Sequence, residues 1–493
     1  MPFWRRRLIY TGATVVIIAA YITFFNIIQQ AILTAHRISR SLPPTTPTPR
    51  THLPSVTGFS LEMQFRTAPT YSCPSVKIPH LTSIRRSNSV WQHPLDTDIY
   101  LLSAYFDDRL NVYGRSYPFI RIIAMYEGTS NTTFYCQIWN KKGEKVSITE
   151  ANLLEIWFES WDQRPRTRSY RPYLVSCPVM HGMPKYVSVV PQPCAGATSL
   201  LEVRGREMFA VKKNFAVCVK GLDFHTDISQ QFIEWMEMLR ILGAEKVGLY
   251  VYHVHPRLAK VLQYYERLGM ADVVPITLPG FQPNFPVERM KFLRRNVWQK
   301  RRNELVPYND CFYRYAKRYR YIVPIDVDEM IVPVKHDNWT ELVLHLQRTD
   351  PELLEKYASY SAQQVYFLST SQTEEDLEKV KSAGIPQYFG PALRHIRRAA
   401  DFAPPGHSVK SFMSSDKCLT VFNHYALDPL YPGMRRDTLL PRELVQLNHY
   451  KNECPVSAQK DCPMYLSRTQ IDMDMWRYKD RLIIKVNEVL SQL

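Results

Sequence analysis

Two aspartates one residue apart interrupt an apolar segment, and their spacing suggests chemistry. Asp326 and Asp328 lie within the sequence Tyr-Ile-Val-Pro-Ile-Asp-Val-Asp-Glu-Met-Ile-Val-Pro of residues 321–333. In a strand, alternate side chains share a face, so the two carboxylates would point the same way. Like charges this close favour a cation between them, and hard oxygen ligands suit manganese or magnesium, which usually bind a substrate phosphate as well. The alternative is a strand end whose acids cap the following turn or helix.

The hydrophobic pattern before this pair predicts a parallel sheet. Apolar segments typical of buried strands alternate with amphipathic helices, and a further helix precedes the strand that ends at Asp326. The predicted strands cover 215–220, 247–252 and 271–276, two helices end at Gly243 and Gly269, and the further helix covers 301–318. This alternation indicates a doubly wound α/β fold, in which ligands bind at the carboxyl ends of the strands. The aspartates lie at such an end, which favours the metal and diphosphate site.

Pro324 lies inside the strand expected before the pair. Proline cannot donate a ladder hydrogen bond, so we expect either a local bulge or a strand that becomes regular only after it. The carboxylates themselves are unaffected by this choice.

A smaller domain precedes the α/β domain. Residues 97–190 contain short alternating segments separated by turn signals, which predicts an antiparallel sheet that either binds carbohydrate or only supports its neighbour. A chain of 493 residues is also too long for one ordinary core. The net charge of +16 fits nucleic acid, an anionic membrane surface or an anionic substrate such as a sugar nucleotide. Because no basic helix with interleaved aromatics, zinc-finger spacing or RNP-like motif is present, we expect no nucleic-acid partner.

The N-terminus predicts a membrane anchor. Three arginines at 5–7 precede an apolar run over 8–28, long enough to span a bilayer and oriented by the positive-inside rule with the rest of the chain in the lumen. A secretory signal peptide is the alternative. Two glycosylation sequons, at Asn131 and Asn338, fit a lumenal location. Nine cysteines without a CxxC pair predict disulfides, with at least one thiol left over.

These features divide the chain into six parts. The predicted divisions are a cytosolic tail at 1–7, a transmembrane helix at 8–28, a stem containing a Pro/Thr/Ser-rich segment at 29–90, a β-rich accessory domain at 91–205, a catalytic α/β domain at 206–460 and a helical extension at 461–493. An anchored lumenal protein with an acid pair at a strand end of an α/β domain suggests a nucleotide-sugar glycosyltransferase of the GT-A type.

An ordered series of motifs over residues 97 to 455 resembles glycosyltransferase family 92. The matching segments are Ser103–Arg109, Cys218–Lys220, Glu234-Trp235 with Leu242-Gly243 and Tyr250, Tyr264–Gly269, Asn309–Cys311 with Arg314, Asp326–Glu329 with Pro333, Val409–Ser411, Asn423–Tyr425 and Asn448–Tyr450. The resemblance implies an inverting GT-A enzyme of the Golgi membrane. It most often implies a β-1,4-galactosyltransferase that uses UDP-galactose and Mn²⁺, with an N-glycan or another oligosaccharide as acceptor.

The resemblance also suggests roles for individual residues. Asp326 and Asp328 would bind the metal and, through it, the diphosphate, and His449, or else His424, would complete the metal site. Donor phosphates would be met by cations from a set that contains Lys220, Arg394, Arg397, Arg398 and Lys410. The catalytic base is open among downstream acids, namely Glu374, Glu375, Asp376, Asp401 and Asp416, with Glu329 as a base or as a residue that orients its neighbours.

Two other interpretations remain open. In the first, the chain is a membrane-anchored glycan-binding protein or an inactive relative. In the second, it is a transferase that uses another UDP-sugar. Asp310 has a simpler interpretation as a helix-interior ion-pair partner of Arg314, four residues further on.

Overall fold

The computed structural model describes most of the chain after residue 69. The described ranges are 70–109, 118–129, 132–140, 146–158, 161–162, 168–207, 209–406, 408–455 and 458–493. The predicted membrane span at 8–28, the Pro/Thr/Ser-rich segment and the sequon at Asn131 lie outside them. Among the described helices, none is long and apolar enough to cross a membrane.

The first part of the described chain is a β-rich unit, as its alternating pattern predicts. Its nine-stranded sheet has the order β1-β5-β4-β8-β9-β2-β3-β7-β6. The strands are β1 (Thr70–Tyr71), β2 (Ile99–Asp107), β3 (Phe119–Glu127), β4 (Tyr135–Asn140), β5 (Val146–Glu150), β6 (Asn152–Glu155), β7 (Tyr170–Pro178), β8 (Pro184–Val190) and β9 (Leu201–Arg204). The described pairings are antiparallel except for β2 with β9, which run parallel.

The second part confirms the mixed α/β prediction. Four parallel strands in the order β12-β11-β10-β13 form one half of its main sheet. They are β10 (Lys213–Phe224), β11 (Ala244–Val254), β12 (Ala271–Pro275) and β13 (Tyr319–Pro324), and they are connected through helices α2 (Ser229–Leu242), α3 (Pro256–Arg267), α4 (Pro286–Arg295) and α5 (Val297–Tyr315). Gly243 ends α2 with φ 108°, a left-handed conformation that glycine adopts at little cost.

Strands from later in the chain complete the sheet. Beyond β13 the order continues β17-β15-β21-β14, with β20 paired to β15. These strands are β14 (Glu329–Pro333), β15 (Tyr357–Leu368), β17 (Val409–Ser414), β20 (Arg435–Leu439) and β21 (Val445–Lys451). The β13–β17 and β14–β21 pairs are antiparallel, whereas β15–β21 is parallel, so the sheet is mixed.

Shorter elements surround this sheet. They are α6 (Trp339–Thr349), α7 (Pro351–Lys356), α8 (Glu374–Ser382), α9 (Pro391–Arg394), β16 (Arg397–Ala399), β18 (Cys418–Val421), β19 (Ala426–Pro429), α10 (Cys462–Ser467), β22 (Thr469–Ile471) and α11 (Lys479–Leu490). Leu482, Val486 and Val489 of α11 are buried in the same core cluster as α2. The predicted C-terminal extension therefore packs on the α/β core.

The aspartate pair lies in a turn and not in a strand, which corrects the predicted boundary. Strand β13 ends at Pro324, which pairs with Cys218 of β10, and β14 begins at Glu329. Residues 325–328 form the connection, and Ile325 N still donates to Cys218 O at 3.0 Å. Because Pro324 is the last residue of its strand, its missing N–H breaks no interior ladder bond, and the expected bulge is not needed.

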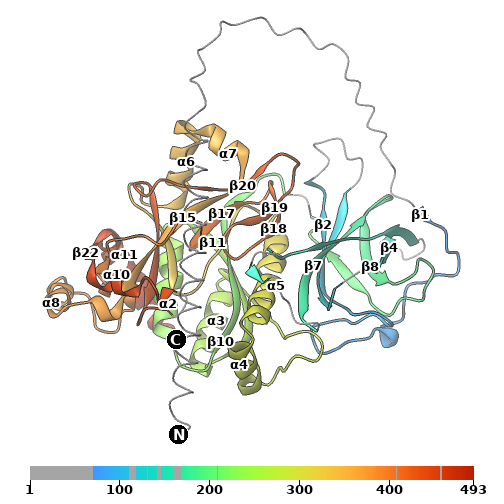
Figure 1. Cartoon of the computed structure of the whole chain (residues 1–493), viewed down its shortest axis with the longest axis horizontal. Helices are drawn as coiled ribbons and strands as arrows, with labels where there is room; N and C mark the ends of the chain where they lie inside the picture. Colours follow the sequence, from blue (N-terminus) through green and yellow to red (C-terminus); the bar gives the residue numbers. More distant parts are fainter. Residues whose placement is uncertain are drawn as a thin grey trace, which may run out of the picture. The chain divides into compact units, whose positions relative to one another are not determined.

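Helix α5 runs between the two parts and joins them (Figure 1). One hydrophobic cluster contains Tyr105 and Tyr170 of the β-rich unit together with Tyr308 and Phe312 of α5. Asp310 of α5 is buried in the same region. It accepts hydrogen bonds from Ser103, Tyr105 and Tyr250 and forms an ion pair with Arg314. Asp310 therefore has the expected ion pair and also links the two parts.

Eight of the nine cysteines form disulfides, as the lumenal prediction anticipates. The pairs are Cys73–Cys194, Cys136–Cys177, Cys218–Cys311 and Cys454–Cys462. Cys418 is the remaining thiol, and it is buried.

Candidate donor and metal site

Five of the residues predicted to bind donor and metal lie on or next to strands of the main sheet and meet beside the 325–328 connection. Lys220 lies on β10, the aspartates follow β13, Lys410 lies on β17 and His449 on β21. The register places His449 opposite Glu329, the first residue of β14. Because these strands are neighbours in one sheet, side chains far apart in sequence converge at one place.

Asp326 is held by two lysines and a tyrosine. Its carboxylate lies 3.1 Å from Lys220 Nζ and 3.4 Å from Lys410 Nζ, and Tyr308 OH donates to Oδ1 at 3.1 Å. Burial alone would raise the pKa of Asp326, but Lys220 and Lys410 outweigh it and hold the pKa well below its usual value. Asp326 therefore remains ionised, as a metal ligand must be.

Asp328 lies beside an imidazole and a third lysine. Its Oδ2 is 3.7 Å from His449 Nε2 and accepts a hydrogen bond from Lys451 Nζ. Burial raises the pKa of Asp328, but the neighbouring side chains of His449 and Lys451 outweigh it and lower the pKa to about 2. Asp328 is thus also a carboxylate at neutral pH.

His449 presents one nitrogen to this turn. Its Nδ1 is 2.8 Å from Gln364 Oε1, and with the amide oxygen facing it Nδ1 carries the proton. Nε2 is buried without a hydrogen-bond partner and faces Asp328. In a histidine that binds a metal through one ring nitrogen, the other ring nitrogen is usually held by a hydrogen bond.

Glu329 contacts the backbone of Asp326 and the side chains of Lys410 and His449. Its Oε2 accepts from the backbone N–H of Asp326 at 3.1 Å and lies 3.4 Å from Lys410 Nζ, while Oε1 is 3.6 Å from His449 Nδ1. Since Glu329 is buried against both a metal-ligand candidate and a lysine, its contacts match the orienting role.

Several residues of the site were missed from the sequence. Glu304 of α5 is 3.6 Å from Lys220 Nζ and 2.9 Å from Arg301, and Tyr308 contacts Asp326 directly. Burial raises the pKa of Glu304, but the charges of Lys220 and Arg301 outweigh burial, so the pKa lies below its usual value. The available signal was helical spacing, because Glu304 and Tyr308 are four residues apart and share one face of α5.

The other predicted residues lie elsewhere or have different partners. Arg394 lies on α9 and donates to Gln387 O at 3.0 Å, and its contacts do not include the aspartates. Glu375 lies on the surface of α8, 73% exposed, in an ion pair with Lys379 at 2.6 Å. Both of these assignments stay predictions without geometric support.

Further candidates have structural partners. Arg397 forms a two-point ion pair with Asp376, and Arg398 pairs with Asp472. His424 Nδ1 lies 2.9 Å from Val409 O. Burial, followed by the charge of Lys410, lowers the pKa of His424 to about 3.

Asn338, the sequon within the described chain, is the N-cap of α6. Its Oδ1 accepts from Glu341 N at 3.0 Å, and its Nδ2 donates to Glu341 Oε1 at 2.9 Å. Its glycosylation stays a prediction.

The donor set fits a divalent cation bound from Asp328 and His449. Carboxylate oxygens and an imidazole nitrogen suit manganese. His449 Nε2 is buried, has no hydrogen-bond partner and faces Asp328, so it is free to bind a metal. Within the described residues, no three His, Cys, Asp or Glu side chains form a ready metal cluster. Lys220, Lys410 and Lys451 neutralise the carboxylates in this arrangement, so a cation at Asp328 would compete with Lys451.

Comparison with known proteins identifies the family. No curated protein matches the sequence. Among solved structures, a β-glucuronidase from Ruminococcus gnavus in complex with C6-substituted uronic isofagomine aligns at 10% identity with a TM-score of 0.14, over 43% of this chain and 36% of its own length. The chain spans about a third of that protein, and so low a score carries no argument. The family model of glycosyltransferase family 92, however, matches residues 213–486, more than half of the sequence. The chain therefore belongs to glycosyltransferase family 92.

Proposed function

We propose that this glycosyltransferase transfers a hexose from a UDP-sugar to a glycan, that it uses Mn²⁺, and that its donor is UDP-galactose. The observation that carries the proposal is the convergence of Asp326, Asp328 and His449 with Lys220 and Lys410, inside the segment that matches the family. Acid, imidazole and ammonium groups together suit a metal-bound diphosphate.

The residues of the chain would divide the work of binding the donor. Asp328 and His449 would hold the cation. Asp326 would become a further ligand when the metal replaces one of the two lysines that contact it. The cation, when bound, supplies positive charge to the diphosphate leaving group. Lys220 and Lys410 lie within 3.4 Å of Asp326 and are placed to meet phosphate oxygens. Glu329 would hold Lys410 and His449 in position.

The proposed reaction inverts the configuration at the anomeric carbon, so α-linked UDP-galactose gives a β-galactoside, and we propose that the acceptor hydroxyl is the one that makes a 1,4 linkage. The acceptor hydroxyl oxygen forms a bond to the anomeric carbon, the bond from that carbon to the UDP oxygen breaks, and UDP leaves with the electron pair. The hydroxyl proton passes to a carboxylate base. Glu329 is already engaged with Lys410 and His449, so we assign it a positioning role.

We also propose that the enzyme is a type II protein of the Golgi membrane with its catalytic part in the lumen. The support is the apolar run at 8–28 after three arginines, together with four disulfides, which form and persist in oxidising compartments.

A donor screen tests the activity. Purified full-length protein is incubated with UDP-galactose, UDP-glucose or UDP-N-acetylglucosamine, with and without Mn²⁺, and UDP release is measured against the Asp328→Asn variant. We expect Mn²⁺-dependent release with UDP-galactose that the variant loses by about a hundredfold or more, the scale for removal of a group that stabilises transition-state charge. Faster turnover of another UDP-sugar would reassign the donor. Glycan binding without turnover of any donor would instead favour an inactive, glycan-binding relative.

A further inference from the structure

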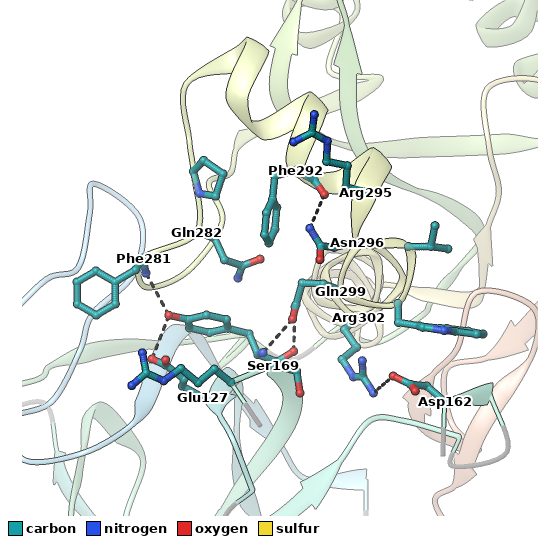
Figure 2. Close-up of a pocket in the computed structure, with 15 residues that line it drawn as sticks. Glu127, Asp162, Ser169, Phe281, Gln282, Phe292, Arg295, Asn296, Gln299 and Arg302 are labelled. Atoms are coloured by element: carbon teal, nitrogen blue, oxygen red, sulfur yellow. Dashed lines mark hydrogen bonds and ion pairs between the residues drawn. The ribbon is translucent and has the colours of Figure 1, made fainter. Parts of the chain in front are cut away.

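A cavity of about 700 Å³ lies where the β-rich unit meets α4 and α5 (Figure 2). Glu127 and Ser169, from the region of β3 and β7, line one wall, and Gln282, Gln299 and Arg302 line the other. Its size is within the range of small-molecule pockets. Its lining includes none of the lysines, acids or histidine of the candidate donor site.

Hydrogen bonds across the cavity hold its walls together. Tyr170 N donates to Gln299 Oε1 and Gln299 Nε2 donates to Tyr170 O, both at 2.9 Å. The hydroxyl of Tyr170 accepts from Phe281 N at 3.1 Å and donates to Glu127 Oε2 at 3.0 Å (Figure 2). Because these bonds link β7, α5 and the segment before α4, the cavity is formed before any ligand binds.

Polar atoms in this wall lack partners. Ser169 Oγ and Arg302 Nε line the cavity region and are buried without a hydrogen bond, as is Trp157 Nε1, whose ring lies 4.4 Å from the Arg302 guanidinium. Ser169 is 7% and Arg302 2% exposed. These atoms have almost no accessible surface, so the polar groups that a ligand in the cavity can reach are those of the exposed Arg168 and Arg295 and the half-buried Glu127, which can all hydrogen-bond to hydroxyl groups.

Aromatic rings at the same cavity remain open to solvent. Trp298 is 44% exposed and lines the cavity, whereas the ring of Phe281, 91% exposed, points away from it (Figure 2). The apolar C–H face of a pyranose ring can pack on such a ring, while its hydroxyl groups reach the polar wall. An apolar face beside polar side chains is the combination that a sugar needs.

An aromatic path connects the cavity with the donor site. The ring of Trp298 lies 6.5 Å from that of Trp161, which lies 5.8 Å from the imidazole of His424. The neighbouring Asn423 O accepts from Lys410 Nζ at 3.1 Å. On the same helix, Arg302 borders the cavity while Glu304 is 3.6 Å from Lys220. Because residues two apart on a helix point to different sides, the cavity and the donor site lie on different sides of α5.

We propose that this cavity holds the part of an oligosaccharide acceptor that extends away from the reacting hydroxyl. The inference rests on the proposed transferase function. It assigns the β-rich unit a share in acceptor recognition, because residues of that unit form one wall of the cavity. Acceptor length then contributes to specificity, and a single sugar is a poorer acceptor than an oligosaccharide.

The test compares exposed aromatic residues inside and outside the cavity in the full-length protein. Trp298→Ala removes a ring from it, and Phe285→Ala is the matched control, because Phe285 is 78% exposed and does not line it. The probes are released N-glycans and β-1,4-galactan oligosaccharides. Three quantities are measured: glycan binding without donor by saturation-transfer NMR, the acceptor KM, and hydrolysis of UDP-galactose by water.

We expect Trp298→Ala to weaken glycan binding and to raise the acceptor KM by about tenfold, while donor hydrolysis stays unchanged. Phe285→Ala should match the wild type in all three quantities. Unchanged binding in Trp298→Ala, or no binding of either probe to the wild type, would overturn the proposal. If the wild type hydrolyses no UDP-sugar, the proposed function fails separately, and the NMR comparison alone decides whether the cavity binds glycan.

Discussion

Replacing Glu234 with glutamine is expected to stabilise the fold near neutral pH. Glu234 lies on α2, is 1% exposed, and has its Oε1 buried without a hydrogen-bond partner. Its other oxygen faces Gly390, where an added Cβ would lie 2.1 Å from it. Burial raises the pKa of Glu234 to about 8, against the opposing effect of backbone N–H groups at Ala392 and Leu393. The folded protein therefore holds this proton over a wide pH range.

The sign and size of the effect follow from proton linkage. The unfolded carboxyl ionises near 4.5, while the folded one stays protonated until about pH 8. Stability is therefore greatest at low pH and falls as the pH rises between these values, by about 1.4 kcal/mol per unit. From pH 5 to pH 8 the contribution of Glu234 to the free energy of unfolding should decrease by about 3 kcal/mol, a loss that a neutral glutamine does not share.

Urea unfolding at pH 5, 6, 7 and 8, followed by tryptophan fluorescence, measures this difference. Titrations of other groups affect wild type and Glu234→Gln alike, so the difference between their free energies of unfolding isolates Glu234. The variant should gain on the wild type steadily as the pH rises. Two curves that stay parallel across this range would refute the assignment of a buried, protonated acid.

Three other changes have definite expectations. Asp310→Asn should lower the free energy of unfolding by about 3 kcal/mol in urea titrations, because it leaves Arg314 and three buried hydroxyl donors without their carboxylate; an unchanged midpoint would show that the link is not needed. Lys451→Gln should tighten Mn²⁺ binding by about fivefold in calorimetric titrations, since it removes a competitor for Asp328 worth about 1 kcal/mol; weaker binding would contradict this. Glu375→Gln should leave kcat unchanged, because the residue is exposed and paired with Lys379; a large loss of kcat would make it the base.

The secondary structure around the site could be predicted because its signals are local. The apolar segments and the glycines that end α2 and α3 predict the first parallel strands correctly. The strand before Asp326 was predicted two residues too long. The alternating spacing of Asp326 and Asp328 fits a strand as well as a turn, and only the pairing of Pro324 with Cys218 shows where β13 ends.

The partners of the site depend on contacts that local patterns do not encode. Lys451 reaches Asp328 across 123 positions of sequence, and Lys410 reaches Asp326 across 84. Glu375 looked suitable because it follows an apolar strand, but it lies on the exposed surface of α8 and pairs with Lys379. The shared wall of the cavity was equally hidden, since it combines Tyr170 with Gln299, 129 residues apart.

The binding of UDP with and without Mn²⁺ tests the central claim most directly. Calorimetric titration of UDP into wild type and Asp328→Asn measures whether the carboxylate joins metal and diphosphate. We predict that Mn²⁺ strengthens UDP binding to the wild type by at least about tenfold, as expected when a cation bridges two negative groups, and that the variant loses this gain. Equal enhancement by Mn²⁺ in both proteins, or none in the wild type, would contradict the assignment of Asp328 and its neighbours as the metal and donor site.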